Sequence, residues 1–264
     1  MARPCAVQHV AVRARVTLDR RQLSAIAHTD HPIAAPLSDE AVDRLLGRAL
    51  GAGRRYLLDL GCGAGHWLLR AASGRPEVSG LGIDLDAGAI ARGRDAVRAA
   101  GLAGRVELRV GDASTFSADR PFDCALSVGA AHAFGGLLPT LEGVRAHLCE
   151  AATVVVGDGF WEREPTDEVL AIGFERAEFA DLATTVDRVV AAGWAPIYGH
   201  VSTSAEWDDY EWSWSGSVTQ WGLDNVGSAG AVEALEAGQR HRGEWLRGYR
   251  GVLGFVTLVL RRAA

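Results

Sequence analysis

The chain has 264 residues, of which 48% are hydrophobic and 23% charged, and these values fit one globular domain with a sizeable core. Its formal net charge of −6 argues against a nucleic-acid backbone as the main partner, because such a partner favours a basic face. All 27 basic residues are arginine, and the lack of lysine excludes a Schiff-base mechanism.

The cysteines and the apolar runs narrow the class of protein further. Cys5, Cys62, Cys124 and Cys149 are widely separated and form no C-x-x-C pair, so we expect neither a metal centre nor a disulfide framework. No apolar run reaches transmembrane length, and the first residues lack a signal-peptide core. The sequence therefore predicts a cytoplasmic protein that does not act at a membrane.

The N-terminal part of the chain predicts two helices. Residues 1–16 show no convincing periodicity and are expected to be flexible, which leaves residues 17–264 as a single domain. A short helix is predicted over residues 18–27. A second helix is predicted from the N-cap Ser38 to about residue 50, with acids in its first turn and glycines beyond its end.

The most informative stretch is residues 56–67, Y-L-L-D-L-G-C-G-A-G-H-W. Apolar residues flank an acid, glycines follow at every second position, and a helical pattern then begins. This pattern predicts a buried parallel strand, a tight turn and a helix N-terminus. The spacing differs from the G-x-G-x-x-G of dinucleotide-binding folds, because Gly65 stands two residues after Gly63 and Asp59 stands two before Gly61.

The string D-L-G-C-G-A-G resembles motif I of the class I S-adenosylmethionine-dependent methyltransferases. The resemblance implies S-adenosylmethionine as the cofactor, a cationic sulfonium nucleoside with an amino-acid tail and no phosphate. It assigns cofactor binding to Asp59, Gly61, Gly63 and Gly65, with Asp59 reaching the ammonium group directly or through water. The alternative interpretation is a generic turn of an α/β fold.

A second acidic motif follows at the distance that the family shows. Residues 78–83 predict strand two, and Asp84 ends it about twenty residues past the glycine turn, where a ribose-binding carboxylate stands. The motif G-I-D-L-D resembles the methyltransferase version, in which Asp84 accepts hydrogen bonds from both ribose hydroxyls and Leu85 also belongs to the cofactor site. Asp86 is expected to cap the helix over residues 87–100.

A third motif, Gly111-Asp112-Ala113, follows a strand predicted over residues 105–110. In the resembled family this acidic loop borders adenine. Asp112 then accepts a hydrogen bond from the exocyclic amine, and the amide of Ala113 reaches a ring nitrogen. An ordinary turn is the alternative, and the order of the three motifs along the chain argues against it.

Strand four is predicted over residues 122–128 and leads into a loop that contains His132. This is the carboxyl end of a central strand, where open α/β sheets place their ligand crevice. The resemblance adds Ser127 to the cofactor-binding residues and places His132 where an acceptor approaches the methyl group. His132 could take the acceptor's proton, orient the substrate or satisfy a loop carbonyl. The loop lacks the N/D-P-P-Y/F of adenine-modifying enzymes that act on nucleic acids.

A polar segment, A-H-T-D-H-P, separates the first two predicted helices, and Pro32 biases the preceding residue away from helix. In the resembled fold the segment before motif I often lies over the cofactor as a lid. His28, Asp30 and His31 are therefore candidates for lining the site. The alternative is a polar turn between two helices.

The next elements carry two further candidates for an acceptor pocket. Strand five is predicted over residues 152–156, between a helix at about 138–149 and one at about 167–179. Trp161 and Glu162 follow strand five and could line the pocket. A tryptophan at this position is equally typical of a cap on the core.

The stretch from Glu206 to about Trp221 combines aromatic and acidic residues. Five of its residues fall at helical spacing and predict one buried stripe of a cap helix, namely Trp207, Tyr210, Trp214, Val218 and Trp221. Trp212, Asp208 and Glu211 lie off the stripe and could face an acceptor. This composition suits an amine or a planar substrate.

Together these elements predict an α/β fold with a Rossmann-like seven-stranded sheet, in the order 3-2-1-4-5-7-6, helices on both faces and a helical cap from about residues 17–50 and 203–247. The implied reaction is transfer of the cofactor's methyl group to an N or O nucleophile of a small molecule, chiefly by holding donor and acceptor in near-attack geometry. Two alternatives stay open: transfer of another group derived from S-adenosylmethionine, such as aminopropyl, and a non-catalytic module that binds S-adenosylmethionine.

Overall fold

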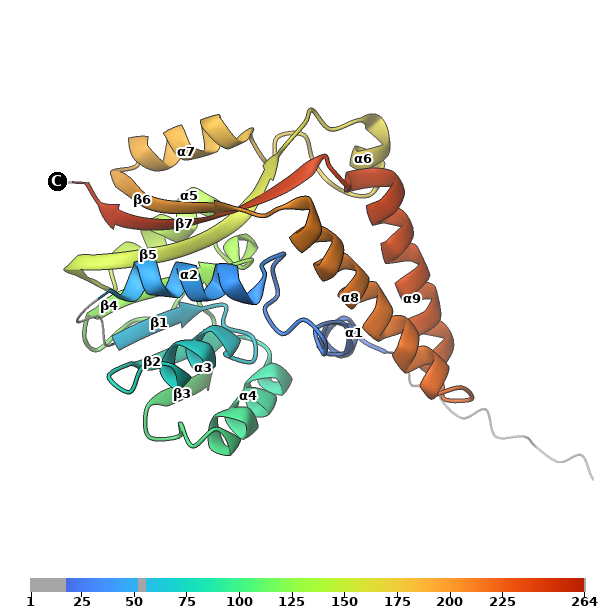
Figure 1. Cartoon of the computed structure of the whole chain (residues 1–264), viewed down its shortest axis with the longest axis horizontal. Helices are drawn as coiled ribbons and strands as arrows, with labels where there is room; N and C mark the ends of the chain where they lie inside the picture. The colour runs from blue at the N-terminus through green and yellow to red at the C-terminus, as the bar shows by residue number, and fades with distance from the viewer. Residues whose placement is uncertain (1–17, 52–55, 264) are drawn as a thin grey trace, which may run out of the picture.

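The computed structural model describes residues 18–51 and 56–263, so the expectation of a flexible segment at residues 1–16 concerns residues outside these ranges. Within them, the strands of one sheet are β1 (Tyr56–Leu60), β2 (Ser79–Asp84), β3 (Val106–Val110), β4 (Phe122–Val128), β5 (Leu148–Trp161), β6 (Trp194–Val201) and β7 (Leu253–Arg262). Their order is β3-β2-β1-β4-β5-β7-β6, which confirms the predicted fold (Figure 1).

The direction of the strands determines where a ligand site can form. β1 pairs in parallel with β2 and β4, and the pairs β2–β3 and β4–β5 are also parallel. β7 lies antiparallel between β5 and β6. The carboxyl ends of β1, β2, β4 and β5 therefore meet at one edge, where open parallel sheets bind ligands.

Helices cover both faces of the sheet. Since successive side chains of a strand point to opposite faces, Leu57 packs in one hydrophobic core and Leu58 in the other. The first core also contains residues of α2 (Asp39–Leu50), α3 (His66–Ser73) and α4 (Ala87–Ala99), and the second contains residues of α5 (Leu137–Arg145) and α7 (Leu182–Ala191). No helix in the described ranges is long and apolar enough to cross a bilayer.

A helical cap extends beyond the carboxyl ends of the strands (Figure 1). It consists of α1 (Arg20–Ala27), α6 (Asp167–Ala171), α8 (Ser204–Asp224), α9 (Ala231–Glu244) and a π-helical turn at Trp245–Tyr249. Ala27, Val218, Ala234 and Ala237 form a small buried core where α1, α8 and α9 meet. The cap thus has packing of its own and stands beside the predicted ligand edge.

Several predicted bounds are wrong in the segment between β4 and β6. α5 ends at Arg145, and β5 runs over 148–161 where a strand was predicted only for 152–156. The longer β5 forms because its last residues pair with β7, from Gly157 opposite Thr257 to Trp161 opposite Leu253. The helix predicted for 167–179 stops at residue 171, and the positive φ of 120° at Gly173 turns the chain into a loop.

Candidate active site

The glycine turn after β1 has the backbone that its sequence predicts. Gly61, Gly63 and Gly65 have φ values of 78°, 54° and 75°, a region that other residues adopt only with strain. A Cβ on Gly61 would lie 2.4 Å from the Cβ of Ala130, so this position also requires close approach. The amide of Gly61 donates to the carbonyl of Ile83 at 2.9 Å and fixes the turn against β2.

Asp59 is the one acid inside β1, and its side chain is buried with 3% exposure. Its Oδ2 atom has no hydrogen-bond partner among the described residues. Burial raises the pKa of Asp59 from its ordinary value of 3.8 to about 8, and the nearby Asp84 carboxylate adds to the rise. A buried, unpartnered carboxyl group of this kind fits a cationic ligand group such as the ammonium of S-adenosylmethionine.

Asp84 ends β2 beside the glycine turn. Its Oδ2 accepts a hydrogen bond from the Gly63 amide at 2.8 Å, and its Oδ1 accepts one from the Asp86 amide, also at 2.8 Å. The carboxylate is partly exposed, and each oxygen keeps a lone pair for a ribose hydroxyl. Leu85, 57% exposed, lies next to it, and Asp86 caps α4 as predicted.

The other residues assigned to the cofactor differ in exposure. The Asp112 carboxylate is exposed and accepts hydrogen bonds from the amide and hydroxyl of Ser114 at 2.8 and 2.7 Å. Ala113 is buried beside it with 6% exposure. Ser127 is completely buried near the end of β4, and its hydroxyl has no hydrogen-bond partner among the described residues.

His132 lies exposed on a short 3-10 helix, Ala131–Ala133, directly after β4. Across from it, Asp158 near the end of β5 interacts electrostatically with His132 and with Glu178. Burial raises the pKa of Asp158 to about 6, although the Gly159 amide, which donates to its Oδ1 at 2.9 Å, acts in the opposite direction. Asp158 was assigned no role from the sequence, because the predicted strand ended before it.

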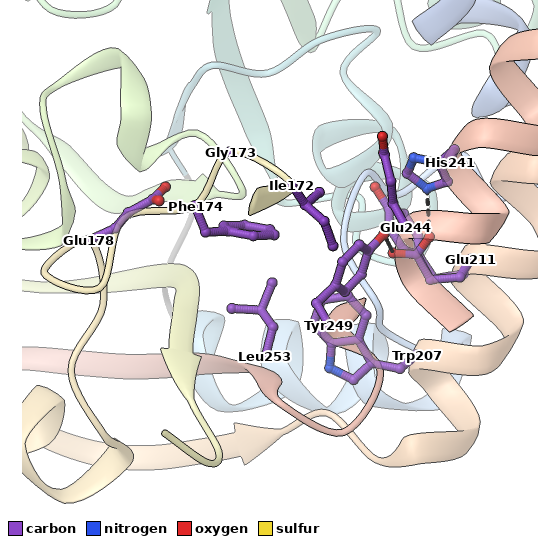
Figure 2. A pocket seen from close by; sticks show the side chains of 11 residues that line it. Ile172, Gly173, Phe174, Glu178, Trp207, Glu211, His241, Glu244, Tyr249 and Leu253 are labelled. Atoms are coloured by element: carbon purple, nitrogen blue, oxygen red, sulfur yellow. Dashed lines mark hydrogen bonds and ion pairs between the residues drawn. The ribbon is translucent and has the colours of Figure 1, made fainter. Parts of the chain in front are cut away.

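A pocket of about 440 Å³ opens between the cap and the start of β7 (Figure 2). Its walls combine aromatic rings, from Phe174, Trp207, Tyr210 and Tyr249, with the carboxyl groups of Glu178, Glu211 and Glu244. Glu178 brings the pocket close to the strand ends, since it interacts electrostatically with Asp158. The pocket therefore lies toward the end of β5, on the same edge of the sheet as the glycine turn.

Glu211 is buried in the wall of this pocket with 2% exposure. Its Oε2 lies 2.6 Å from Nε2 of His241, and its Oε1 accepts a hydrogen bond from the Tyr249 hydroxyl at 2.9 Å (Figure 2). The His241 ring stacks on Trp214 with 3.7 Å between the ring centroids. Helix α8, helix α9 and the π-helical turn thus contribute one connected polar network.

The candidate lid residues His28 and His31 lie against the pocket wall. Nε2 of His28 is 3.2 Å from the Tyr210 hydroxyl, and the His31 ring meets the Tyr210 ring edge-on with 5.2 Å between centroids. Burial lowers the pKa of His28, and the neighbouring His31 and His241 lower it further. Both histidines therefore contact the Tyr210 wall of the pocket from the N-terminal segment.

The structure places four residues predicted for the acceptor pocket elsewhere. Trp161 is buried in the core with 6% exposure, and its Nε1 donates to the Arg176 carbonyl at 3.0 Å. Glu162 is exposed at the end of β5 and does not line the pocket. Trp212 is 51% exposed on the outside of the cap and meets Trp245 edge-on. Asp208 is likewise engaged outside, in an ion pair with Arg250 at 2.7 Å.

The described residues contain no group of three or more His, Cys, Asp or Glu side chains that could hold a metal ion. The residues at the glycine turn instead fit S-adenosylmethionine. Asp59 offers an unpartnered carboxyl group for its cationic tail, and Asp84 offers oxygen acceptors for ribose hydroxyls. These two acids and the turn between them define the class of protein as an S-adenosylmethionine-binding Rossmann-like domain.

Comparisons with known proteins agree with this class. Residues 57–151 match the family model described as a methyltransferase domain. An S-adenosylmethionine-dependent methyltransferase from Geobacter sulfurreducens, solved with S-adenosylhomocysteine, has a TM-score of 0.84 and 24% identity, over 93% of this chain and 99% of the other. Its counterpart from Thiobacillus denitrificans, also with S-adenosylhomocysteine, has a TM-score of 0.82 and 25% identity over the same shares.

Two relatives found by sequence are also similar. The uncharacterized protein YjhP of Escherichia coli is 27% identical over 74% of this chain and 79% of its own length. The methyltransferase ungE' of Aspergillus campestris is 37% identical over 37% of this chain, but over only 28% of its own length. With the matched domain and the fold, these findings place the chain among the class I S-adenosylmethionine-dependent methyltransferases, with S-adenosylmethionine as its cofactor.

Proposed function

We propose that the protein transfers the methyl group of S-adenosylmethionine to an N or O nucleophile of a small molecule that binds in the pocket beneath the cap. The observation that carries this proposal is the position of the pocket, about 440 Å³ in volume and adjacent to the strand ends through Glu178 and Asp158. Such a volume is typical of sites for small molecules.

The residues divide between the two ligands. Gly61, Gly63 and Gly65 let the backbone approach the cofactor, Asp59 neutralises its ammonium group, and Asp84 accepts from its ribose. Asp112 and Ala113 border the adenine. When bound, S-adenosylmethionine supplies an electrophilic methyl group, and the protein's contribution is to hold the acceptor in line with it.

His132 is a candidate proton acceptor or orienting group for the acceptor. It is exposed at the end of β4, and Asp158 interacts with it electrostatically across the edge of the sheet. His28 and His31 contact Tyr210 and would hold this pocket wall without contacting the nucleophile.

Two other functions use the same cofactor. An aminopropyl transferase would release methylthioadenosine, and a binding module would release nothing. The pocket favours an enzyme, because a module that only binds the cofactor has no need of a second cavity beside it. The negative net charge disfavours a nucleic-acid acceptor.

The test is a screen of small molecules for release of S-adenosylhomocysteine, with mass spectrometry of the acceptor. Methyl transfer requires S-adenosylhomocysteine and an acceptor heavier by one methyl group in equal amounts. The Asp59→Asn variant is the matched control, since it keeps the pocket and loses the carboxylate for the cofactor. Release of methylthioadenosine, or tight cofactor binding without any product from a broad screen, would contradict the proposal.

A further inference from the structure

The walls of the acceptor pocket are built mainly from connected aromatic rings. The centroids of Phe174 and Tyr249 are 5.8 Å apart, and those of Trp207 and Tyr249 are 6.3 Å apart, both pairs in T-shaped contact. Trp207 in turn meets Tyr210 at 6.5 Å, also edge-on. Rings that meet edge-on present faces in several directions, and the negative face of a ring attracts a cation.

The charges around the same pocket favour the same occupant. Its carboxyl groups lie on two sides in Figure 2, Glu178 on one and Glu211 and Glu244 on the other. Among the described residues that line it, none is an arginine, and the chain has no lysine. The one basic side chain, His241, is held by Glu211. A carboxylate or phosphate in this pocket would meet like charge, whereas an ammonium group would meet opposite charge.

The buried Glu211 carboxylate also determines which ring nitrogen of His241 carries the proton. One oxygen of Glu211 accepts a hydrogen bond from the Tyr249 hydroxyl. Burial raises the pKa of Tyr249, and the nearby Glu211 carboxylate raises it further, so the hydroxyl keeps its proton and remains a donor. Because a carboxylate only accepts hydrogen bonds, Nε2 of His241 keeps its proton and donates it in a hydrogen bond to Glu211 Oε2, 2.6 Å away. In the neutral imidazole the other nitrogen, Nδ1, is then the acceptor, and no described residue forms a hydrogen bond with it.

We infer that the acceptor is a compact primary or secondary amine that binds as a cation among these rings and carboxylates, and that His241, oriented by Glu211, takes its proton. Of the two roles open to His132, this leaves that of orienting the acceptor. This inference rests on the proposed methyl transfer. The ammonium proton passes to Nδ1, and the freed lone pair on nitrogen forms the N–C bond while the C–S bond of the methyl donor breaks and its electron pair stays on sulfur. The His241 side chain is 24% exposed, so it can return the proton to solvent.

Other titratable groups surround His241 and enter its pH dependence. Glu211 on α8 lies 2.6 Å from Nε2 of His241, and Glu244 and Tyr249 lie in the same pocket wall. His28 on the N-terminal side interacts with His241 electrostatically, and a positive charge on either one opposes that on the other. Tyr249, hydrogen-bonded to Glu211, carries no charge in the neutral range because its pKa is raised.

The first test measures binding with three probes of one shape. Benzylamine, benzyl alcohol and benzoate are titrated calorimetrically into the protein saturated with S-adenosylhomocysteine. Benzylamine should bind at least about tenfold more tightly than benzyl alcohol, and benzoate should not bind. Glu244→Gln should weaken benzylamine binding about three- to tenfold. Glu162→Gln, the same change on an exposed carboxylate outside the pocket, should leave it unchanged.

The second test separates proton transfer from binding, with the best amine from the screen. His241→Asn should leave the amine's KM within about threefold and lower kcat by about 10²-fold, with the rise of kcat shifted to higher pH. Glu211→Gln should give the same shift, since Glu211 is a positioning residue. If Glu211→Gln does not fold, as its melting curve will show, His241→Asn decides alone.

The outcomes distinguish this inference from the proposed function. Equal binding of benzyl alcohol and benzylamine, or methylation of alcohols and not of amines, would overturn the amine as the substrate class and leave methyl transfer standing. An unchanged kcat and pH profile in His241→Asn would overturn the proton acceptor. Tight benzylamine binding with no S-adenosylhomocysteine released from any acceptor would instead contradict methyl transfer itself.

Discussion

Replacing Asp59 by asparagine should alter stability and cofactor affinity in opposite directions. The buried carboxyl group has a folded-state pKa of about 8, against an ordinary value of 3.8. Because the folded pKa is raised, the folded protein holds a proton that the unfolded chain loses as the pH rises above about 4. The ligand-free protein therefore loses stability between about pH 4 and pH 8, by at most about 1.4 kcal/mol per pH unit.

Asparagine has nearly the same shape and cannot ionise, so Asp59→Asn removes this loss. We expect the free energy of unfolding of the variant, relative to the parent, to increase by roughly 2–4 kcal/mol between pH 4 and pH 8. For a chain of this size that corresponds to a relative rise in melting temperature of roughly 5–15 °C. Affinity for S-adenosylhomocysteine should fall about 10- to 100-fold, because the ammonium loses its carboxylate.

The assay is a set of thermal melts from pH 4 to pH 8.5, without ligand and with S-adenosylhomocysteine, on the parent, Asp59→Asn and the control Asp119→Asn. Asp119 is exposed, so its variant should follow the parent at every pH. Calorimetry in two buffers should also show that the parent releases close to one proton when ligand binds at pH 7. A gap between Asp59→Asn and parent that is the same at pH 4 and pH 8 would refute the reasoning.

Three further predictions concern the edges of the site. Asp84→Ala should weaken S-adenosylhomocysteine binding about 10- to 100-fold by calorimetry and cost about 1–2 kcal/mol of stability, because two backbone amides lose their acceptor. Burial acts to raise the pKa of Glu206, but hydrogen bonds lower it to about 2. Glu206 should therefore add about 1–2 kcal/mol to the free energy of unfolding above about pH 4.5, and this contribution should be lost toward pH 2. Glu206→Gln should remove this pH dependence in denaturant titrations. Trp214→Ala should lower the free energy of unfolding by about 1–3 kcal/mol, because Trp214 stacks on the His241 ring. Trp212→Ala should lower it by under about 1 kcal/mol, because Trp212 is 51% exposed. Equal losses of stability in thermal melts would contradict this order.

The sheet could be predicted because its strands carry local signals. β1 and β4 are mainly apolar runs, the predicted bounds of β4 are those of the structure, and the glycine turn and Asp84 mark the ends of β1 and β2. The second half of β5 carries no such signal, since Gly157, Asp158 and Gly159 have low strand propensity. Its pairing with β7, distant in sequence, keeps it extended.

The acceptor pocket could not be predicted because three distant segments build it. Phe174 and Glu178 come from a loop that the periodicity assigned to a helix, and His241 comes from α9. The stripe on α8 assumed one buried side, but α1, α9 and the π-helical turn contact this helix from different directions. Glu211 is therefore more deeply buried than Trp214, although it lies off the stripe, because its carboxylate has two partners within the cap.

The N-terminal segment, residues 28–38, is joined to the wall of the acceptor pocket by contacts spaced along α8. Glu206 accepts hydrogen bonds from the amide and hydroxyl of Ser38 at 3.0 and 2.8 Å, at the start of the helix. Tyr210 meets the two lid histidines one turn later, and Ser217 donates to Asp30 at 2.7 Å further along. The same segment passes so close to the end of β4 that a Cβ on Gly129 would lie 2.8 Å from the Ala34 carbonyl oxygen. The contacts that fix the segment beside the cofactor edge therefore also fix the Tyr210 wall, so a substitution that displaces the segment should disturb cofactor and acceptor binding together.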